Sequence, residues 1–371
     1  MTRIYLDNNA TTAIHPGVLE VLEETLRDVY GNASSIHREG QSARRVLENA
    51  RESVATLIRA TARELVFTSG GSESNNAAIF GVAPPEGSFH IVTSAIEHPS
   101  VAEPVRELEQ RGAEVTRVAP SRSGEVPAAA VIDAIRPDTR LVTVMLANNE
   151  TGVVQPLEPI GQATRERGVH FHVDAVQAPG KIPIDVNALN ADTLALSAHK
   201  LHAPKGIGAL YVRRGVKMSS HLRGGAQERR RRPGTENVPL AAAFGAAAAL
   251  RPPVEEIAAL RDLFEDQVRS SLEVTINGVE ARRLPNTSNI TFHGADGEGI
   301  VIALDLSGVA VSTGSACSSG RVEPSPVLLA MGLTPDEARG TVRFSLSRFT
   351  TAEEIGKTAA LLRELVPRCG L

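Results

Sequence analysis

A glycine-rich segment of the sequence could bind a phosphate group. Thr68-Ser69-Gly70-Gly71-Ser72-Glu73 follows an apolar run and precedes helical residues from Ser74 onward. Glycine lets a backbone approach an anion closely, and the first N–H groups of a helix have no partner within the helix. The alternative is an ordinary turn between a strand and a helix. The segment matches neither the dinucleotide-binding fingerprint nor the P-loop, which disfavours NAD and ATP.

A lysine and an aspartate at the ends of two other apolar runs could complete a cofactor site. Lys200 closes the run 193–200, where burial would lower the pKa of its amine and make it nucleophilic. Asp174 lies late in the run 169–177, and a buried carboxylate requires a cation such as a protonated pyridine nitrogen. The alternatives are a lysine that reaches back to water and an aspartate that caps a turn or forms a salt bridge. Pyridoxal 5′-phosphate needs a Schiff-base lysine, an acid for its ring nitrogen and a phosphate site, so these three features fit one cofactor.

Cys317 lies in the sequence Gly314-Ser315-Ala316-Cys317-Ser318-Ser319-Gly320. Small polar residues between glycines predict an exposed loop, where an accessible thiol can act as a nucleophile. The alternative is an incidental surface cysteine, which is the interpretation we favour for Cys369 near the end of the chain.

Seven β-type runs must position these residues. They alternate with amphipathic segments such as 101–111 and 156–167, a pattern that predicts a doubly wound, mainly parallel sheet. The last two runs are close enough to form a hairpin, which predicts an antiparallel edge strand. Such sheets bind ligands beyond the carboxyl ends of their strands. The runs are 64–70, 89–98, 114–120, 141–149, 169–177, 193–200 and 206–213.

The rest of the chain predicts a second, smaller α+β domain. After an alanine-rich segment, Pro252-Pro253 marks a break. A helix over 254–270, four short strand-like runs near 273–279, 286–293, 309–313 and 341–347, and a final helix over 351–365 follow. We therefore predict a large domain over residues 15–250 and a small domain over residues 1–14 and 251–371 that carries the Cys317 loop.

Composition excludes several classes of function. The 371 residues are 42% hydrophobic and 22% charged, with a net charge of −4, which indicates a globular chain with no need for a nucleic-acid partner. Trp is absent and aromatic residues are only 3%, so a base-stacking platform is not expected. Two cysteines exclude a disulfide framework and a cysteine-rich metal site. The sequence has no signal peptide and no apolar run of membrane-spanning length, which predicts a cytoplasmic protein without a membrane partner.

Nine segments, in order and spacing over nearly the whole chain, resemble the NifS/IscS-like (group I) cysteine desulfurases of the class V aminotransferase superfamily. The resemblance implies the type I fold of pyridoxal-phosphate-dependent transferases, an α/β fold whose large domain has a seven-stranded, mainly parallel sheet. The segments are YLDNNATT (5–12), TSGGSESNN (68–76), EHPSV (97–101), ANNETG (147–152), HVDAVQ (172–177), SAHKLHAPKGIGALYVR (197–213), GTENV (234–238), GSACSSG (314–320) and RFSLSRFTT (343–351).

The resemblance also implies roles for individual residues. Pyridoxal 5′-phosphate would be held as a Schiff base on Lys200, which with Cys317 and His98 would form the catalytic set. Asp174 would pair with the ring nitrogen, and no metal is implied. His98 would stack on the ring, Gln177 would bond to the ring hydroxyl oxygen, and the phosphate would be bound by Gly71, Ser72, Ser197 and His199. In a homodimer, Thr235 would contact the phosphate of the neighbouring subunit. Asn149 would contact both the cofactor and the substrate carboxylate, Arg343 would bind that carboxylate, and Asn8 would shape the substrate pocket.

The activity implied is removal of sulfur from L-cysteine, giving L-alanine and a persulfide on Cys317. An acceptor protein or a small thiol would then receive the sulfur, for iron–sulfur cluster assembly or thiolation. Departures from the family pattern are Ser72 for Thr, Ala203 and Ala226 for Gly, and the basic run Arg229–Arg232. That run is either a solvated surface near the dimer interface or a docking site for an acidic acceptor.

Three other functions stay open from the sequence. A selenocysteine lyase would use the same residues, because sulfur and selenium differ little in size. A plain class V aminotransferase has no need of Cys317. A non-catalytic scaffold protein would have no reason to retain Lys200, Asp174 and Arg343 together.

Overall fold

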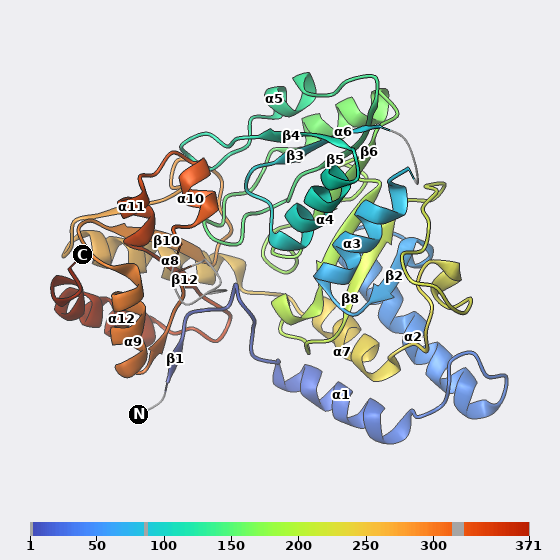
Figure 1. Cartoon of the computed structure of the whole chain (residues 1–371). Helices are drawn as coiled ribbons and strands as arrows, with labels where there is room; N and C mark the ends of the chain where they lie inside the picture. The colour runs from blue at the N-terminus through green and yellow to red at the C-terminus, as the bar shows by residue number, and fades with distance from the viewer. Residues whose placement is uncertain (1–2, 85–87, 314–322, 371) are drawn as a thin grey trace.

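The computed structural model describes residues 3–84, 88–313 and 323–370. Its centre is a seven-stranded sheet in the order β2-β8-β7-β6-β5-β3-β4, which confirms the predicted fold class (Figure 1). The strands are β2 (Leu65–Thr68), β3 (His90–Ser94), β4 (Glu114–Val118), β5 (Thr139–Thr143), β6 (His170–Asp174), β7 (Thr193–Ser197) and β8 (Gly208–Val212).

One strand of this sheet runs against the others. β8 pairs antiparallel with β7, as the predicted hairpin requires, and it also pairs antiparallel with β2. The prediction that the antiparallel strand lies at the edge is therefore wrong, because β2 covers its outer side. Because two reversals cancel, β2 runs parallel to β7, and its carboxyl end lies at the same edge of the sheet as the ends of β3, β5, β6 and β7.

Helices cover both faces of the sheet, and the alternation of side chains along each strand decides which helix each residue meets. Val66 packs with Ala78 of α3, whereas its neighbour Phe67 joins the cluster that contains Phe244 of α7. Ile91 and Leu141 likewise pack with α3 and α4, on the face opposite α2, α6 and α7. The helices of this part are α1 (Pro16–Asp28), α2 (Arg38–Leu57), α3 (Gly71–Val82), α4 (Pro99–Gln110), α5 (Ala128–Asp133), α6 (Leu157–Glu166) and α7 (Val238–Ala248).

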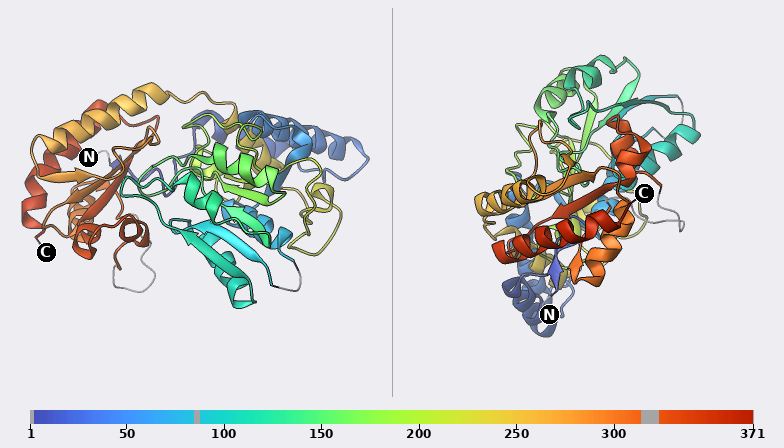
Figure 2. Two further views of the ribbon diagram at one scale, coloured as in Figure 1. Left: turned by 90° about the horizontal axis from the view of Figure 1, so that it is seen from above. Right: turned by 90° about the vertical axis from the view of Figure 1, so that its left-hand side faces the viewer.

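The C-terminal elements gather at one end of the molecule (Figure 2). They form a three-stranded antiparallel sheet, β12-β10-β9, with its own apolar cluster. The N-terminal strand β1 (Ile4–Tyr5) pairs with β11, and Ile4 and Leu6 pack into this second cluster. The elements are α8 (Val254–Arg269), β9 (Val274–Ile276), β10 (Thr287–Phe292), α9 (Gly297–Leu306), β11 (Val309–Ala310), α10 (Pro326–Ala330), α11 (Pro335–Arg339), β12 (Thr341–Ser345) and α12 (Ala352–Leu365).

The predicted division into domains stays a prediction. The first core cluster, which surrounds the seven-stranded sheet, also takes in Val327 and Leu328 of α10 and Ala338 of α11. Cys369 packs at the second cluster. In the described part of the chain, no helix is both long and apolar enough to cross a membrane.

Candidate active site

A cavity of about 260 Å³ opens where the strands of the large sheet end. The structure brings together nine residues that the sequence predicts as site residues, and they come from five strands, either as the last residue of the strand or from the segment that follows it. They are Gly71, Ser72, His98, Asn149, Asp174, Gln177, Ser197, His199 and Lys200, and the wall is completed by Ala10, Ser100, Met145, Ala147 and Val176.

One end of the cavity is the start of α3. The helix begins at Gly71, three residues earlier than the sequence indicates, and its first internal bond runs from the Ser74 N–H to the Gly70 carbonyl. The N–H groups of Gly71 and Ser72 thus precede the helical ladder, at the positive end of the helix dipole. A Cβ at position 71 would lie 2.6 Å from Val176 Cγ2, so only glycine lets the helix start approach the cavity wall this closely. These features fit a bound phosphate.

Lys200 follows β7, and its Nζ donates to the carbonyls of Asn9 and Ala10. Burial and, to a smaller extent, the nearby Arg343 lower the pKa of this amine to about 8, although Asp7 and Asp174 act in the opposite direction. A substantial fraction of the amine is therefore neutral near pH 8, as a nucleophile or a base must be.

Asp174 ends β6 and accepts two hydrogen bonds, from Asn75 Nδ2 at 2.8 Å and from the Val176 N–H at 2.9 Å. Both contacts are donors to the carboxylate, so Asp174 acts here only as an acceptor, which fits a protonated ring nitrogen. His98 caps α4, and burial is the main reason why its pKa is lowered, although Asp174 partly opposes that effect. Its imidazole is therefore neutral at physiological pH.

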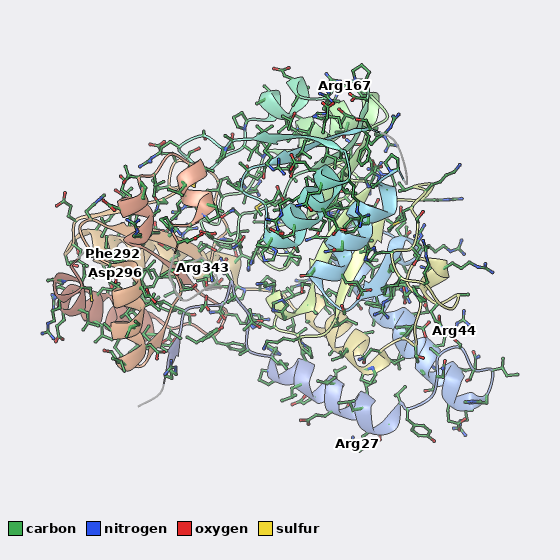
Figure 3. All side chains as sticks on the ribbon, viewed as in Figure 1. Arg27, Arg44, Arg167, Phe292, Asp296 and Arg343 are labelled. Carbon is green, nitrogen blue, oxygen red and sulfur yellow. The ribbon has the colours of Figure 1, made fainter. Side chains whose placement is uncertain are left out.

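Arg343 of β12 comes from the C-terminal sheet and reaches toward the large sheet (Figure 3). It donates to the Asn149 carbonyl at 3.0 Å and to Asp7 Oδ1 at 2.7 Å. Its Nε is buried and has no hydrogen-bond partner among the described residues. A guanidinium with an unused buried donor next to Asn149 fits a carboxylate ligand.

Asn9, which no sequence pattern singled out, is buried and connects several site residues. Its carbonyl accepts from Lys200 and Gln177, and its amide nitrogen donates to the Asn149 carbonyl at 3.1 Å. Its amide oxygen accepts from Lys181, a second buried lysine that also donates to Gln177 Oε1. Burial lowers the pKa of Lys181 to about 7. The scarcity of lysine was the one sequence signal that could have drawn attention to it.

Asn8 and Thr235 do not line this cavity, and neither does Arg343, although Arg343 contacts the wall residue Asn149. The Asn8 side chain donates to the carbonyls of Tyr5 and Ser345 and lines a second, smaller cavity on the far side of Lys200. Thr235 is exposed and away from the cavity of its own chain. Cys317 lies outside the described residues. The roles expected of these residues stay predictions.

The basic run Arg229–Arg232 is largely engaged within the chain. Glu228, Arg229 and Arg230 all have left-handed backbone angles, and this turn directs Glu228 inward to the buried Arg51. Arg232 pairs with Glu73 in the first turn of α3 at 2.9 Å. Arg229 and Arg230 are nevertheless exposed, so the two interpretations of the run, a solvated surface near the dimer interface and a docking site for an acidic acceptor, both stay predictions. Within the described residues, no cluster of three His, Cys, Asp or Glu side chains could hold a metal ion.

Comparisons with known proteins agree with this geometry. Residues 4–357 match the family described as aminotransferase class-V. A curated cysteine desulfurase from Nostoc sp. is 46% identical over 99% of this chain and 94% of its own. Among solved structures, a NifS-like protein superposes with a TM-score of 0.91 at 34% identity, covering 99% of this chain and all of its own. SspA in complex with cysteine superposes with a TM-score of 0.86 at 38% identity, covering 94% of this chain and all of its own.

Proposed function

Since this chain belongs to the class-V aminotransferase family and, within it, to the cysteine desulfurases, we propose that it removes sulfur from L-cysteine and releases L-alanine. The family depends on pyridoxal 5′-phosphate. The observation that supports the proposal is that Lys200, Asp174 and the start of α3 line one cavity.

The residues around this cavity fit pyridoxal phosphate. The start of α3, with Ser72, Ser197 and His199, would hold the phosphate, and Asp174 would face the ring nitrogen. His98 would lie on the ring face and Gln177 would donate to the ring oxygen. When bound, the cofactor supplies an electron sink for the bond that breaks at the substrate's α carbon.

The chain's own groups perform the remaining work. Arg343 and Asn149 bind the carboxylate of cysteine and so orient the molecule. Lys200 Nζ takes up the Cα proton, because its lowered pKa leaves much of the amine neutral.

Sulfur then moves to Cys317. The thiolate attacks the substrate sulfur, a sulfur–sulfur bond forms, and the bond from sulfur to Cβ breaks with its electron pair left on carbon. Return of a proton to Cα from Lys200 Nζ and protonation at Cβ give alanine, so one cysteine and one thiol become one alanine and one persulfide. Support comes from the two sides of the 314–322 segment. Ser312 exchanges backbone hydrogen bonds with Arg343, and Ser325 donates to Glu150, the neighbour of Asn149 in the sequence.

The persulfide sulfur passes to an acceptor protein or a small thiol in the cytoplasm, for cluster assembly or thiolation. The active form is a homodimer in which Thr235 contacts the neighbouring subunit's phosphate. Large apolar side chains that are exposed in the isolated chain support the dimer. Leu26 of α1, and Tyr30 and Ile36 in the connection to α2, are 61%, 80% and 93% exposed.

The test is the visible absorption spectrum of the purified protein before and after L-cysteine, with alanine and sulfide measured in the same tube. We expect a yellow protein whose spectrum shifts and which yields alanine, together with sulfide when a reductant is present. A yellow protein that reacts with other amino acids but not with cysteine would refute the desulfurase proposal in favour of an aminotransferase.

Variants assign the residues. Lys200→Ala should lose both the colour and turnover. Cys317→Ala should keep the colour and form no persulfide, while the matched variant Cys369→Ala should behave as wild type. Desulfuration at the wild-type rate by Cys317→Ala would contradict the proposed mechanism.

A further inference from the structure

A chain of buried polar side chains lies behind Asp174, on the side away from the cavity. His170, His172 and Thr193 occupy neighbouring strands β6 and β7, and Asn75 projects toward them from α3. Thr193 Oγ1 is 2.9 Å from both His170 Nε2 and His172 Nδ1. His172 Nε2 is 3.0 Å from Asn75 Oδ1. The described residues thus connect two strand histidines to one amide.

The same amide reaches the active site in two directions. Asn75 Nδ2 lies 2.8 Å from Asp174 Oδ2 and 2.8 Å from Ser100 Oγ. Ser100 Oγ is in turn 2.7 Å from His98 Nδ1. Asn75 is therefore shared by the aspartate that faces the predicted ring nitrogen and by the histidine predicted to lie on the ring.

The number of protons on each group fixes which atom donates in each of these hydrogen bonds. The Ser100 N–H donates to His98 Nδ1, so that nitrogen is an acceptor, and the Ser100 hydroxyl must donate to it as well. Ser100 Oγ then accepts from Asn75 Nδ2, whose other hydrogen goes to Asp174. Asn75 Oδ1 must accept from a protonated His172 Nε2, which leaves His172 Nδ1 to accept from the Thr193 hydroxyl. Burial strongly disfavours a second proton on His172, lowering its pKa to about 3.

The opposite orientation of the Asn75 amide would place two acceptors next to each other at Asp174. If His172 carried its proton on Nδ1, Asn75 would turn its nitrogen toward His172 and its oxygen toward Asp174. Two acceptors would then face each other, which is tolerable only if Asp174 is protonated. The tautomer of His172 and the charge of Asp174 are thereby linked through the orientation of one amide.

We propose that Asn75 and His172 are positioning residues: His172 fixes the orientation of the Asn75 amide, and the amide donates to Asp174 and keeps the proton of His98 on Nε2. Neither residue touches the cavity, and both act through a neighbour. The consequence for a cofactor rests on the proposed function, whereas the direction of the hydrogen bonds does not.

The first test is the tautomeric state of the histidines in the full-length protein, labelled with 15N at histidine and measured by two-bond 15N–1H correlation. We expect His98, His170 and His172 each to carry the proton on Nε2. A proton on His172 Nδ1 would overturn the inference on its own, with no need of a variant or of activity.

The second test is Asn75→Ala, with Asn76→Ala as the matched control. Asn76 is the same residue type one position on in α3, and its amide donates to the Ser72 and Ser100 carbonyls rather than to Asp174. The pH at the midpoint of the visible absorbance change of the bound cofactor should move by roughly one unit in Asn75→Ala, because Asp174 loses one of its two donors. It should stay unchanged in Asn76→Ala.

The outcomes separate the two proposals. A colourless wild-type protein would refute the proposed function and leave the histidine tautomers to decide this inference. A coloured wild type with the same midpoint in Asn75→Ala would refute the inference and leave the proposed function standing.

Discussion

The buried ion pair between Arg51 and Glu228 predicts a large loss of stability when only one partner is changed. Both side chains are almost fully buried, at 4% and 2% exposure. Glu228 accepts from Arg51 at 2.6 and 2.8 Å and from the Phe67 N–H at 3.1 Å. Burial acts to lower the pKa of Arg51, but the bonds to Glu228 outweigh it and the net shift is upward. Because a guanidinium is not deprotonated in proteins, Arg51 stays charged when Glu228 is neutralised.

Glu228→Gln removes the negative charge and turns an amide N–H toward the guanidinium or the Phe67 N–H. Arg51 then keeps only the partly exposed Glu48, 3.2 Å from its Nε, as a charged partner. Breaking a buried ion pair from one side costs about 3–5 kcal/mol. We expect the free energy of unfolding, measured by urea denaturation, to fall by about that amount. The exposed pair Arg368–Glu364 provides the matched control, with side chains 67% and 59% exposed. Glu364→Gln should cost only about 0.3–0.5 kcal/mol.

A double variant separates the charge from the packing. Arg51→Met with Glu228→Leu removes both charges and keeps the volume filled, so it should recover most of the lost stability. An equal loss in Glu228→Gln and Glu364→Gln would refute the reasoning. A double variant as unstable as Glu228→Gln would show that shape rather than the unpaired charge sets the cost.

Three further predictions concern ionisable groups at or near the cavity. Loss of a nearby cation raises the pKa of an amine, so Arg343→Leu should raise the pKa of Lys200. Loss of a nearby anion lowers the pKa of an amine, so Asp7→Asn should lower the pKa of Lys200. The pH dependence of the rate at which added pyridoxal phosphate forms a visible chromophore measures both, and shifts of the same sign would contradict the assignment. Arg343→Leu should also raise KM for cysteine about 10- to 100-fold, through loss of charge-assisted bonds to the carboxylate. Burial raises the pKa of Glu97 to about 8, so folded Glu97 keeps a proton that the unfolded chain releases above about pH 4.5. Wild-type stability should therefore fall between pH 5 and pH 8, and Glu97→Gln should flatten that fall in urea denaturation. A slope unchanged by the substitution would show that Glu97 does not titrate in this range.

The sequence by itself determined the strands and the chemical residues at their ends. Apolar runs predict strands because a strand buried on both faces needs no alternation. Six of the seven predicted runs contain their strands, and the run 141–149 overlaps only the last three residues of β5. The carboxyl-end rule for parallel sheets is enough to place Gly71, Asp174 and Lys200 at one edge of the sheet. These are local or topological facts, which composition and order along the chain encode.

The tertiary structure alone decided the contacts among those residues. That β2 pairs with β8 depends on which strand edges remain free after the rest of the sheet has formed, which no local pattern records. Asn9 connects with Lys200 across 191 positions, and Asn75 with Asp174 across 99. Glu228 sits in a run that looks solvated, yet its left-handed turn carries it to Arg51. Hydrogen-bond partners far apart in sequence are chosen by three-dimensional packing, because a buried donor must find whichever acceptor the fold brings within about 3 Å.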